Sequence, residues 1–153
     1  MPSPKLLLGV LQVIVILLQQ KCGVSQEISG PQPVDLGHVP GVVVREAVDD
    51  FERRARERLE EANKEAGHST WLTAPRLVSA KEQTVQGKLF YLTLVVGESF
   101  CDYSTPILEC GTDQLHLSSP SEATYQCEMQ IWYRTWMQPP NDLEPQDFSC
   151  NEV

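Results

Sequence analysis

Cysteine and histidine are the residues of this 153-residue chain whose chemistry could support a nucleophile or a metal site. They are Cys22, Cys101, Cys110, Cys127, Cys150, His38, His68 and His116. The histidines lie in separate segments without an HxxxH-like spacing, and no cysteine pair has the two-to-four-residue separation of a zinc site. No phosphate-binding loop and no G-x-S-x-G motif is present either. We therefore expect no catalytic residue, no metal and no cofactor.

The first residues have the three-part pattern of a secretory signal peptide. MPSPK carries one positive charge, residues 6–18 are almost entirely apolar, and a polar stretch with small residues follows. The apolar run is short for a membrane-spanning helix, and a single-pass anchor is the alternative. We expect cleavage after Ser25, which makes residues 1–25 a signal peptide and residues 26–153 one secreted, extracellular domain.

Removal of the signal peptide takes Cys22 with it and leaves four cysteines, an even number that suits disulfides in an oxidising compartment. Four cysteines allow three pairings. We favour Cys101–Cys110 and Cys127–Cys150, because each pair closes a local segment of the chain. In the chain-entropy model each of these loops contributes roughly 3 kcal/mol to stability.

Charge and composition limit the classes of partner that this chain is expected to bind. The formal net charge of −9 argues against nucleic acid, whose phosphates require Lys and Arg, and against an anionic membrane surface. Hydrophobic residues make up 41% of the chain, which is enough for a packed core.

One long helix is the first element that the pattern predicts. Residues 27–41 are rich in Pro and Gly and have no period, so we interpret them as an extended arm. Residues 42–66 follow, with one apolar stripe at spacings of three and four. The stripe consists of Val44, Val48, Phe51, Ala55, Leu59 and Ala62. We interpret the many Arg and Glu side chains around it as a solvated face.

The sequence pattern after Gly67 predicts about four antiparallel strands. They fall at residues 71–85, with an interruption at Pro75, then at 88–96, 123–134 and, more weakly, 142–150. Alternating apolar residues define the buried faces of two of them. These are Phe90, Leu92, Leu94 and Val96 in one, and Tyr125, Cys127, Met129, Ile131 and Tyr133 in the other. The simplest fold is α+β, with one long helix packed across a curved antiparallel sheet.

Two hairpin connections are expected at the same end of this sheet. The first is QTVQG, Gln83 to Gly87, in which Gly87 can adopt a positive φ. The second is RTWMQPPND, residues 134–142, which carries Trp136. The arm before the helix can reach that end as well, so that the three segments would form a wedge shaped to enter a groove.

These residues resemble the cystatins, protein inhibitors of papain-like cysteine proteases. Gln83-Thr84-Val85-Gln86-Gly87 is similar to their Q-x-V-x-G loop, Gly30 precedes the long helix, and Trp136 follows the penultimate strand. The order and spacing of the four cysteines resemble those of the secreted, type 2 members. The resemblance covers residues 26–153.

The resemblance implies a competitive, reversible inhibitor. Gly30 would be the hinge of an arm whose residues Ile28 and Ser29 occupy the non-primed pockets of the protease. The first hairpin, formed by Gln83, Thr84, Val85, Gln86 and Gly87, would press on the active-site cleft, and Trp136 would stack on an aromatic side chain beyond it. The partners implied are papain-like cysteine proteases. The chain would be a monomer, and the family also allows a dimer that exchanges the helix and first strand.

Several alternatives remain open. Gly87 could serve only as a turn glycine, Gln83 and Gln86 as solvated turn residues, and Trp136 as a core residue. Gly37 or Gly41 could take the place of Gly30, and we expect Trp71 and Trp132 to be packing residues. Two departures from the family pattern are the bulk of Gln86 and Thr135, where a Pro commonly stands. The alternative function is a non-inhibitory binding or signalling module with the same fold.

Overall fold

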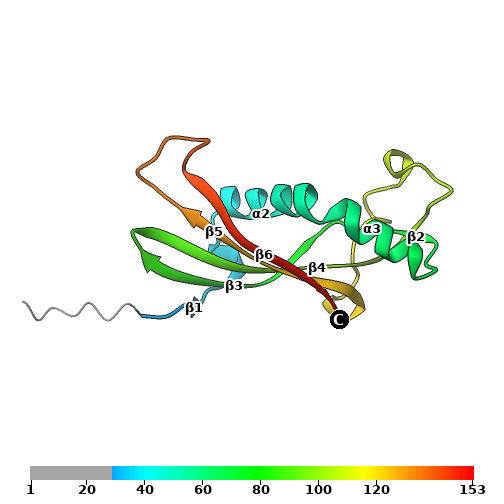
Figure 1. Cartoon of the computed structure of the whole chain (residues 1–153), viewed down its shortest axis with the longest axis horizontal. Helices are drawn as coiled ribbons and strands as arrows, with labels where there is room; N and C mark the ends of the chain where they lie inside the picture. Colours follow the sequence, from blue (N-terminus) through cyan, green and yellow to red (C-terminus); the bar gives the residue numbers. More distant parts are fainter. Residues whose placement is uncertain (1–28) are drawn as a thin grey trace, which may run out of the picture.

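A computed structural model describes residues 29–153, and the expected signal peptide lies outside the described residues. The chain forms a six-stranded antiparallel sheet in the order β1-β3-β4-β5-β6, with β2 paired to β4. Two helices lie across one face of the curved sheet (Figure 1). The elements are β1 (Gln32–Pro33), α2 (Gly41–Arg54), α3 (Arg56–Glu65), β2 (Thr70–Leu72), β3 (Arg76–Val85), β4 (Gly87–Asp102), β5 (Ala123–Tyr133) and β6 (Leu143–Glu152), with short 3-10 turns at Leu36–His38, Ile107–Glu109 and Pro120–Glu122.

The core lies between the helices and the strand faces that the sequence pattern predicts. Phe90, Leu92, Leu94 and Val96 of β4 are buried, as are Tyr125, Cys127, Met129 and Ile131 of β5. Phe51 and Leu59 meet them from the helices. The strand alternation predicted from the sequence is therefore confirmed on both central strands.

The prediction of one long helix is wrong, because α2 and α3 are separate helices that meet at Ala55, whose φ of −125° and ψ of −36° depart from helical values. The next residue, Arg56, donates hydrogen bonds to the backbone carbonyls of Leu72 and Thr73, at 3.5 and 3.0 Å. α3 is thereby directed toward β2, whereas α2 lies across the main sheet (Figure 1).

The buried stripe on the helices is also offset from the predicted one. Val43, Ala47 and Asn63 are fully buried, whereas Val44, Val48 and Ala62, which we expected to form the stripe, are only half-buried. Phe51, Ala55 and Leu59 are buried as predicted.

The charged faces of the helices are not entirely solvated, contrary to expectation. Glu60 is 6% exposed, and its carboxylate accepts hydrogen bonds from the Leu72 N–H (3.0 Å) and the Tyr103 hydroxyl (2.9 Å). Asn63 donates from Nδ2 to the Thr70 carbonyl and to the Tyr103 oxygen, both at 3.1 Å. Burial raises the pKa of Tyr103 to about 12; the bond to Glu60 acts in the same direction and the bond from Asn63 opposes it. This cluster attaches α3 to β2 and to the end of β4.

The two disulfides are Cys101–Cys110 and Cys127–Cys150, which confirms the favoured pairing. The first closes the loop after β4, and the second joins paired residues of β5 and β6. Within residues 29–153, no helix has both the length and the apolar character needed to cross a bilayer.

Candidate functional site

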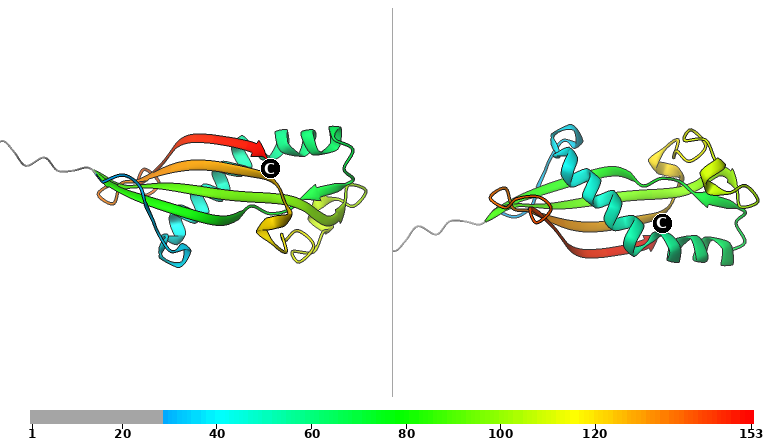
Figure 2. Two further views of the ribbon diagram at one scale, coloured as in Figure 1. Left: turned by 90° about the horizontal axis from the view of Figure 1, so that it is seen from below. Right: turned by 90° about the horizontal axis from the view of Figure 1, so that it is seen from above.

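Three segments meet at one end of the molecule. The arm enters there, the tight turn between β3 and β4 ends there, and so does the longer connection between β5 and β6 (residues 134–142) (Figures 1 and 2). The sheet register explains this, because β4 runs away from the first connection and the antiparallel β5 returns to the same end, where the second connection begins. Ile28, which we expected to belong to this site, lies outside the described residues.

Gly87 is required by the fold at this tip. Its φ of +86° is a conformation that side-chain-bearing residues rarely adopt. A Cβ built on it would collide with the Tyr133 carbonyl oxygen and lie 2.9 Å from Cζ3 of Trp136. The glycine therefore permits both the turn and the close approach of the second hairpin.

Trp132 joins the two hairpins, a role that the sequence analysis missed when it assigned this residue to packing alone. Its Nε1–H donates a hydrogen bond to the Gln86 carbonyl at 2.8 Å. Trp132 lies on β5 opposite Leu89 of β4, and its side chain reaches back along β4 to the turn. The first and second hairpins are thus held as one edge.

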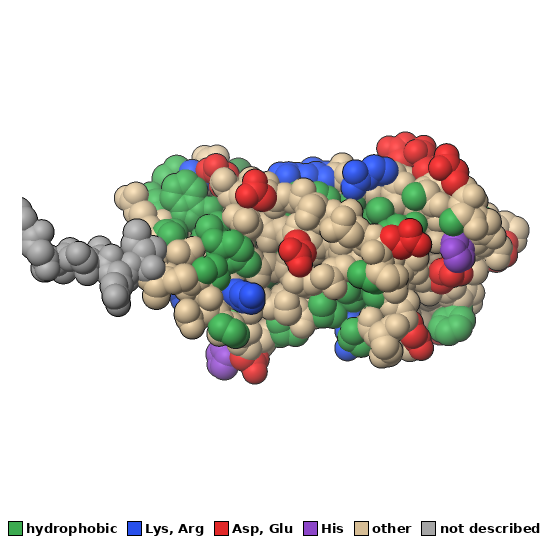
Figure 3. All heavy atoms as spheres, turned by 60° about the horizontal axis from the view of Figure 1, so that its bottom comes forward, with side chains coloured by type: hydrophobic (Ala, Val, Ile, Leu, Met, Phe, Trp, Pro, Cys, Tyr) green, Lys and Arg blue, Asp and Glu red, His purple; other side chains and the backbone are tan. Residues whose placement is uncertain are grey.

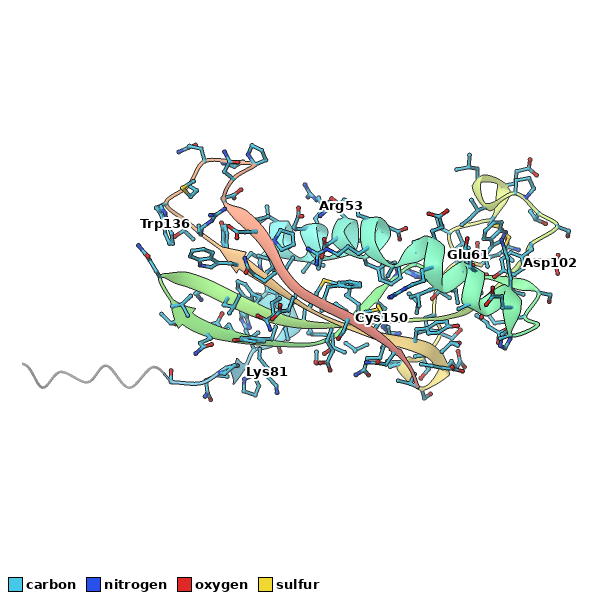
Figure 4. All side chains as sticks on the ribbon, viewed as in Figure 1. Arg53, Glu61, Lys81, Asp102, Trp136 and Cys150 are labelled. Atoms are coloured by element: carbon cyan, nitrogen blue, oxygen red, sulfur yellow. A yellow bond between two sulfur atoms is a disulfide. The ribbon has the colours of Figure 1, made fainter. Side chains whose placement is uncertain are left out.

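Trp136 is a surface residue and does not fold back into the core. It is 49% exposed, and its ring meets the Trp132 ring edge-on with centroids 6.2 Å apart. It stands at the end opposite Glu61 and Asp102 (Figure 4). Val85 and Met137 are the other exposed large hydrophobic residues of the two connections, and a space-filling view shows hydrophobic side chains gathered at this end (Figure 3).

Arg134 braces the second connection from within. Its guanidinium donates to the Asn141 carbonyl (2.6 Å), pairs with the Glu144 carboxylate (2.8 Å) and lies 5.0 Å from the centre of the Trp132 ring. The backbone N–H of Arg134 also donates to the Asp142 carbonyl at 2.7 Å. The Arg134 side chain is only 19% exposed. Its guanidinium therefore lies largely sheltered between the two ends of the connection. These contacts hold the loop in which Thr135 is exposed.

The arm is bound to the edge of the sheet. Gln32 and Pro33 of β1 pair with Glu82 and Lys81 of β3. Further toward the chain start, the Gln83 amide donates from Nε2 to the Ser29 carbonyl at 3.2 Å.

Gly30 is exposed, has no heavy atom within 4 Å of a Cβ built on it, and has no positive φ. The fold therefore gives no reason for a glycine there. The two glycines of the site differ in this respect, since Gly87 is demanded by its surroundings.

The exposed positions of the first hairpin are Thr84, Val85 and Gln86, while Gln83 is half-buried. Gln83 is thus occupied by contacts within the chain. Residues 29–153 contain no group of three or more His, Cys, Asp or Glu side chains that could hold a metal ion. The site offers a shaped edge of backbone, small polar groups and apolar side chains.

The known proteins to which this chain is similar include several cystatins. No family model matches the sequence. Cystatins of Tropidechis carinatus and Notechis scutatus scutatus are each 26% identical over 115 residues, covering 72% of this chain and 79% of the relative. Among solved structures, dimeric human cystatin F matches with a TM-score of 0.45 and 16% identity over 85% of this chain and 94% of its own.

The sequence is thus similar to cystatins, and the chain has a cystatin-like fold, with two helices packed on a curved antiparallel sheet and two disulfides.

Proposed function

We propose that this protein is a secreted, reversible and competitive inhibitor of papain-like cysteine proteases. The observation that carries the proposal is the convergence of the arm and both hairpins into one edge, with a half-exposed Trp136 supported from beneath by Trp132 and Gly87. The similarity to curated cystatins supports the same reading. Secretion after cleavage of residues 1–25, and membership of the type 2 subgroup, are parts of the proposal.

The edge suits inhibition of a cleft because it is ordered before binding. Disulfide Cys127–Cys150 and the bond from Trp132 to Gln86 fix the hairpins on the sheet. An ordered surface loses little conformational entropy on association, which favours tight binding. A large aromatic ring at the centre of such a surface is the usual form of a binding hot spot.

In this proposal Thr84, Val85, Gln86 and Gly87 face the active-site cleft of the protease, and Trp136 anchors the primed side. The arm around Gly30 enters the non-primed side, where the open space beside this residue allows the backbone to approach the enzyme closely. No peptide bond is presented to the catalytic cysteine, so the inhibitor is released intact.

The test is a titration of papain and of a cathepsin with purified residues 26–153. Trp136→Ala is compared with Phe100→Ala, which removes a side chain of similar type that is 76% exposed near the other end of β4. We expect competitive inhibition, weakened about 30-fold or more by Trp136→Ala and unchanged by Phe100→Ala. A correctly folded protein that inhibits neither enzyme would overturn the proposal and leave a cystatin-fold module with another partner.

The oligomeric state is part of the same experiment. We propose a monomer as the active form, since exchange of elements through the first hairpin would open the turn at Gln86 and Gly87. Size-exclusion chromatography with light scattering separates the two forms. Inhibition that resides in a dimer fraction would contradict this part of the proposal.

A further inference from the structure

One side chain connects the arm to the first hairpin. Gln83 donates from Nε2 to the Ser29 carbonyl at 3.2 Å, and its Oε1 accepts a hydrogen bond from the Tyr91 hydroxyl at 2.9 Å. The amide therefore uses both of its polar ends within the chain. Gln83 and Tyr91 are both half-buried, whereas Ser29 is exposed.

The sheet register makes this contact specific. Lys81 of β3 pairs with Tyr91 of β4, and Gln83 pairs with Leu89, so Gln83 and Tyr91 are diagonal neighbours on the face away from the helices. A tyrosine side chain is long enough to span such a diagonal. Pro31 of the arm and Tyr91 line the same shallow depression of about 390 Å³, so the arm and Tyr91 share this face of the sheet.

The arm has little else to hold it at this point. The backbone pairing of β1 with β3 covers Gln32 and Pro33. Among residues 29–153, no other side chain outside the arm donates or accepts a hydrogen bond with residues 29–31. The Gln83 bond thus holds the segment of the arm that lies beyond the paired residues and that we propose to enter the protease.

We propose that Gln83 and Tyr91 form a clasp that sets the direction of the arm along the first hairpin before any protease is bound. Tyr91 orients the amide so that its N–H₂ group points at the Ser29 carbonyl. Gln83 is then a positioning residue and not a contact residue, although it is the first residue of the loop pattern. The expected effect of the clasp on inhibition rests on the proposed function. The expected ordering of the arm is independent of it.

The first experiment measures arm order without a protease. The heteronuclear ¹⁵N relaxation of the Gly30 amide is recorded in the wild type, Gln83→Glu, Gln83→Leu and Tyr91→Phe. Gln83→Glu keeps an acceptor for the Tyr91 hydroxyl but replaces the donor to Ser29 by a carboxylate oxygen, so it isolates that bond. We expect Gly30 to be ordered in the wild type, mobile in both Gln83 variants and intermediate in Tyr91→Phe. A Gly30 amide whose order is unchanged in Gln83→Leu would overturn the clasp.

The second experiment is a double-mutant cycle on inhibition of papain. Gln83→Leu is measured in residues 26–153 and in a chain that begins at Pro31, which lacks Ser29 and Gly30. We expect a loss of about three- to tenfold in the longer chain, the usual effect of one hydrogen bond, and none in the shorter chain. Equal losses in both chains would show that Gln83 contacts the enzyme directly and would reject the positioning role.

The two experiments separate the two proposals. If the wild type does not inhibit, the proposed function fails, and the relaxation of Gly30 still decides whether the clasp exists. Thermal unfolding of each variant serves as the fold control. Thr84→Ala, an exposed neighbour on the same strand, is the matched surface control and should leave Gly30 ordered.

Discussion

The two ends of this molecule expose apolar side chains in different ways. At the hairpin end, Trp136 rests against Trp132 and over Gly87, and Arg134 closes the connection that carries it. At the opposite end, Phe100 and Leu108 are 76% and 96% exposed, more than any large hydrophobic residue of the two hairpins. Exposure alone therefore does not mark a binding site here. What distinguishes the hairpin end is that its exposed residues are held in place by neighbours.

The polar groups show the reverse distribution. The end near α3 buries Glu60 and Asn63 among the backbone of β2 and the Tyr103 hydroxyl. At the hairpin end, the polar groups lie at or near the surface and orient loops. A buried carboxylate costs stability unless it is fully bonded. The two ends should consequently respond differently to mutation: one in stability, the other in binding.

The largest expected effect is on stability, at Glu60. Glu60→Ala leaves the Leu72 N–H, the Tyr103 hydroxyl and the nearby Arg56 guanidinium without a common acceptor. We expect the free energy of unfolding to fall by about 3 kcal/mol, as for other broken buried networks, with inhibition unchanged where the protein is folded. Denaturant unfolding measures it. Glu61→Ala, at an exposed neighbour, is the control. Equal losses at both positions would contradict the importance of the buried cluster.

Two glycines with a similar positive φ allow effects on stability to be distinguished from effects on binding. Gly87 and Gly67 have φ values of +86° and +90°, but only Gly87 has neighbours that an added Cβ would meet. Alanine at Gly67 should cost roughly 1–2 kcal/mol of stability, and alanine at Gly87 should cost more, because its Cβ would also collide with the Tyr133 carbonyl oxygen. Only Gly87→Ala should also displace Trp136 and weaken inhibition, by about tenfold or more. Inhibition reduced equally by Gly67→Ala would show that the loss reflects stability alone.

The sequence alone predicted much of this arrangement. Strand alternation is a local pattern, so the buried faces of β4 and β5 followed from residue types. The two disulfides followed from local loop closure. The convergence of the hairpins needed only the alternation of antiparallel strands, and the positive φ of Gly87 followed from its place in a tight turn.

Features that depend on contacts between distant residues were not predictable in this way. The break at Ala55 has no Pro or Gly to signal it, and it is accompanied by bonds from Arg56 to carbonyls 16 and 17 residues away. The roles of Gln83 and Trp132 depend on which strand residue lies opposite which. The sequence pattern of a charged helix predicts a solvated face, because it does not show which carbonyls and hydroxyls lie opposite the charged side chains.

Arg134 provides a smaller test of the hairpin end. Arg134→Met keeps an apolar stem beside Trp132 and removes the bonds to the Asn141 carbonyl and the Glu144 carboxylate. We expect inhibition to weaken by about tenfold, as for the loss of a charge-assisted hydrogen bond, because the loop that carries Trp136 is no longer closed. Inhibition constants for papain measure the change. Arg45→Met, at an exposed position of α2, is the matched control, and an equal effect there would contradict the brace.

Tyr103, at the opposite end, gives an effect of a different kind, because it depends on pH. Burial raises the pKa of its hydroxyl to about 12, from 10.0, so the folded protein retains this proton where the unfolded chain loses it. Because stability falls with pH where the folded state binds more protons, the contribution is complete below pH 10 and is lost as pH rises toward about 12.

We therefore expect the stability of the wild type to decline between these pH values. The Tyr103→Phe variant should be less stable near neutral pH, but its stability should decline less steeply. Burial raises the pKa of Tyr125 in the same direction, so some slope remains in the variant. Denaturant unfolding at a series of pH values measures both slopes, and Tyr133→Phe at the hairpin end is the control. Identical slopes in the wild type and Tyr103→Phe would show that this hydroxyl titrates alike in the folded and unfolded chains, which its bond to a buried carboxylate argues against.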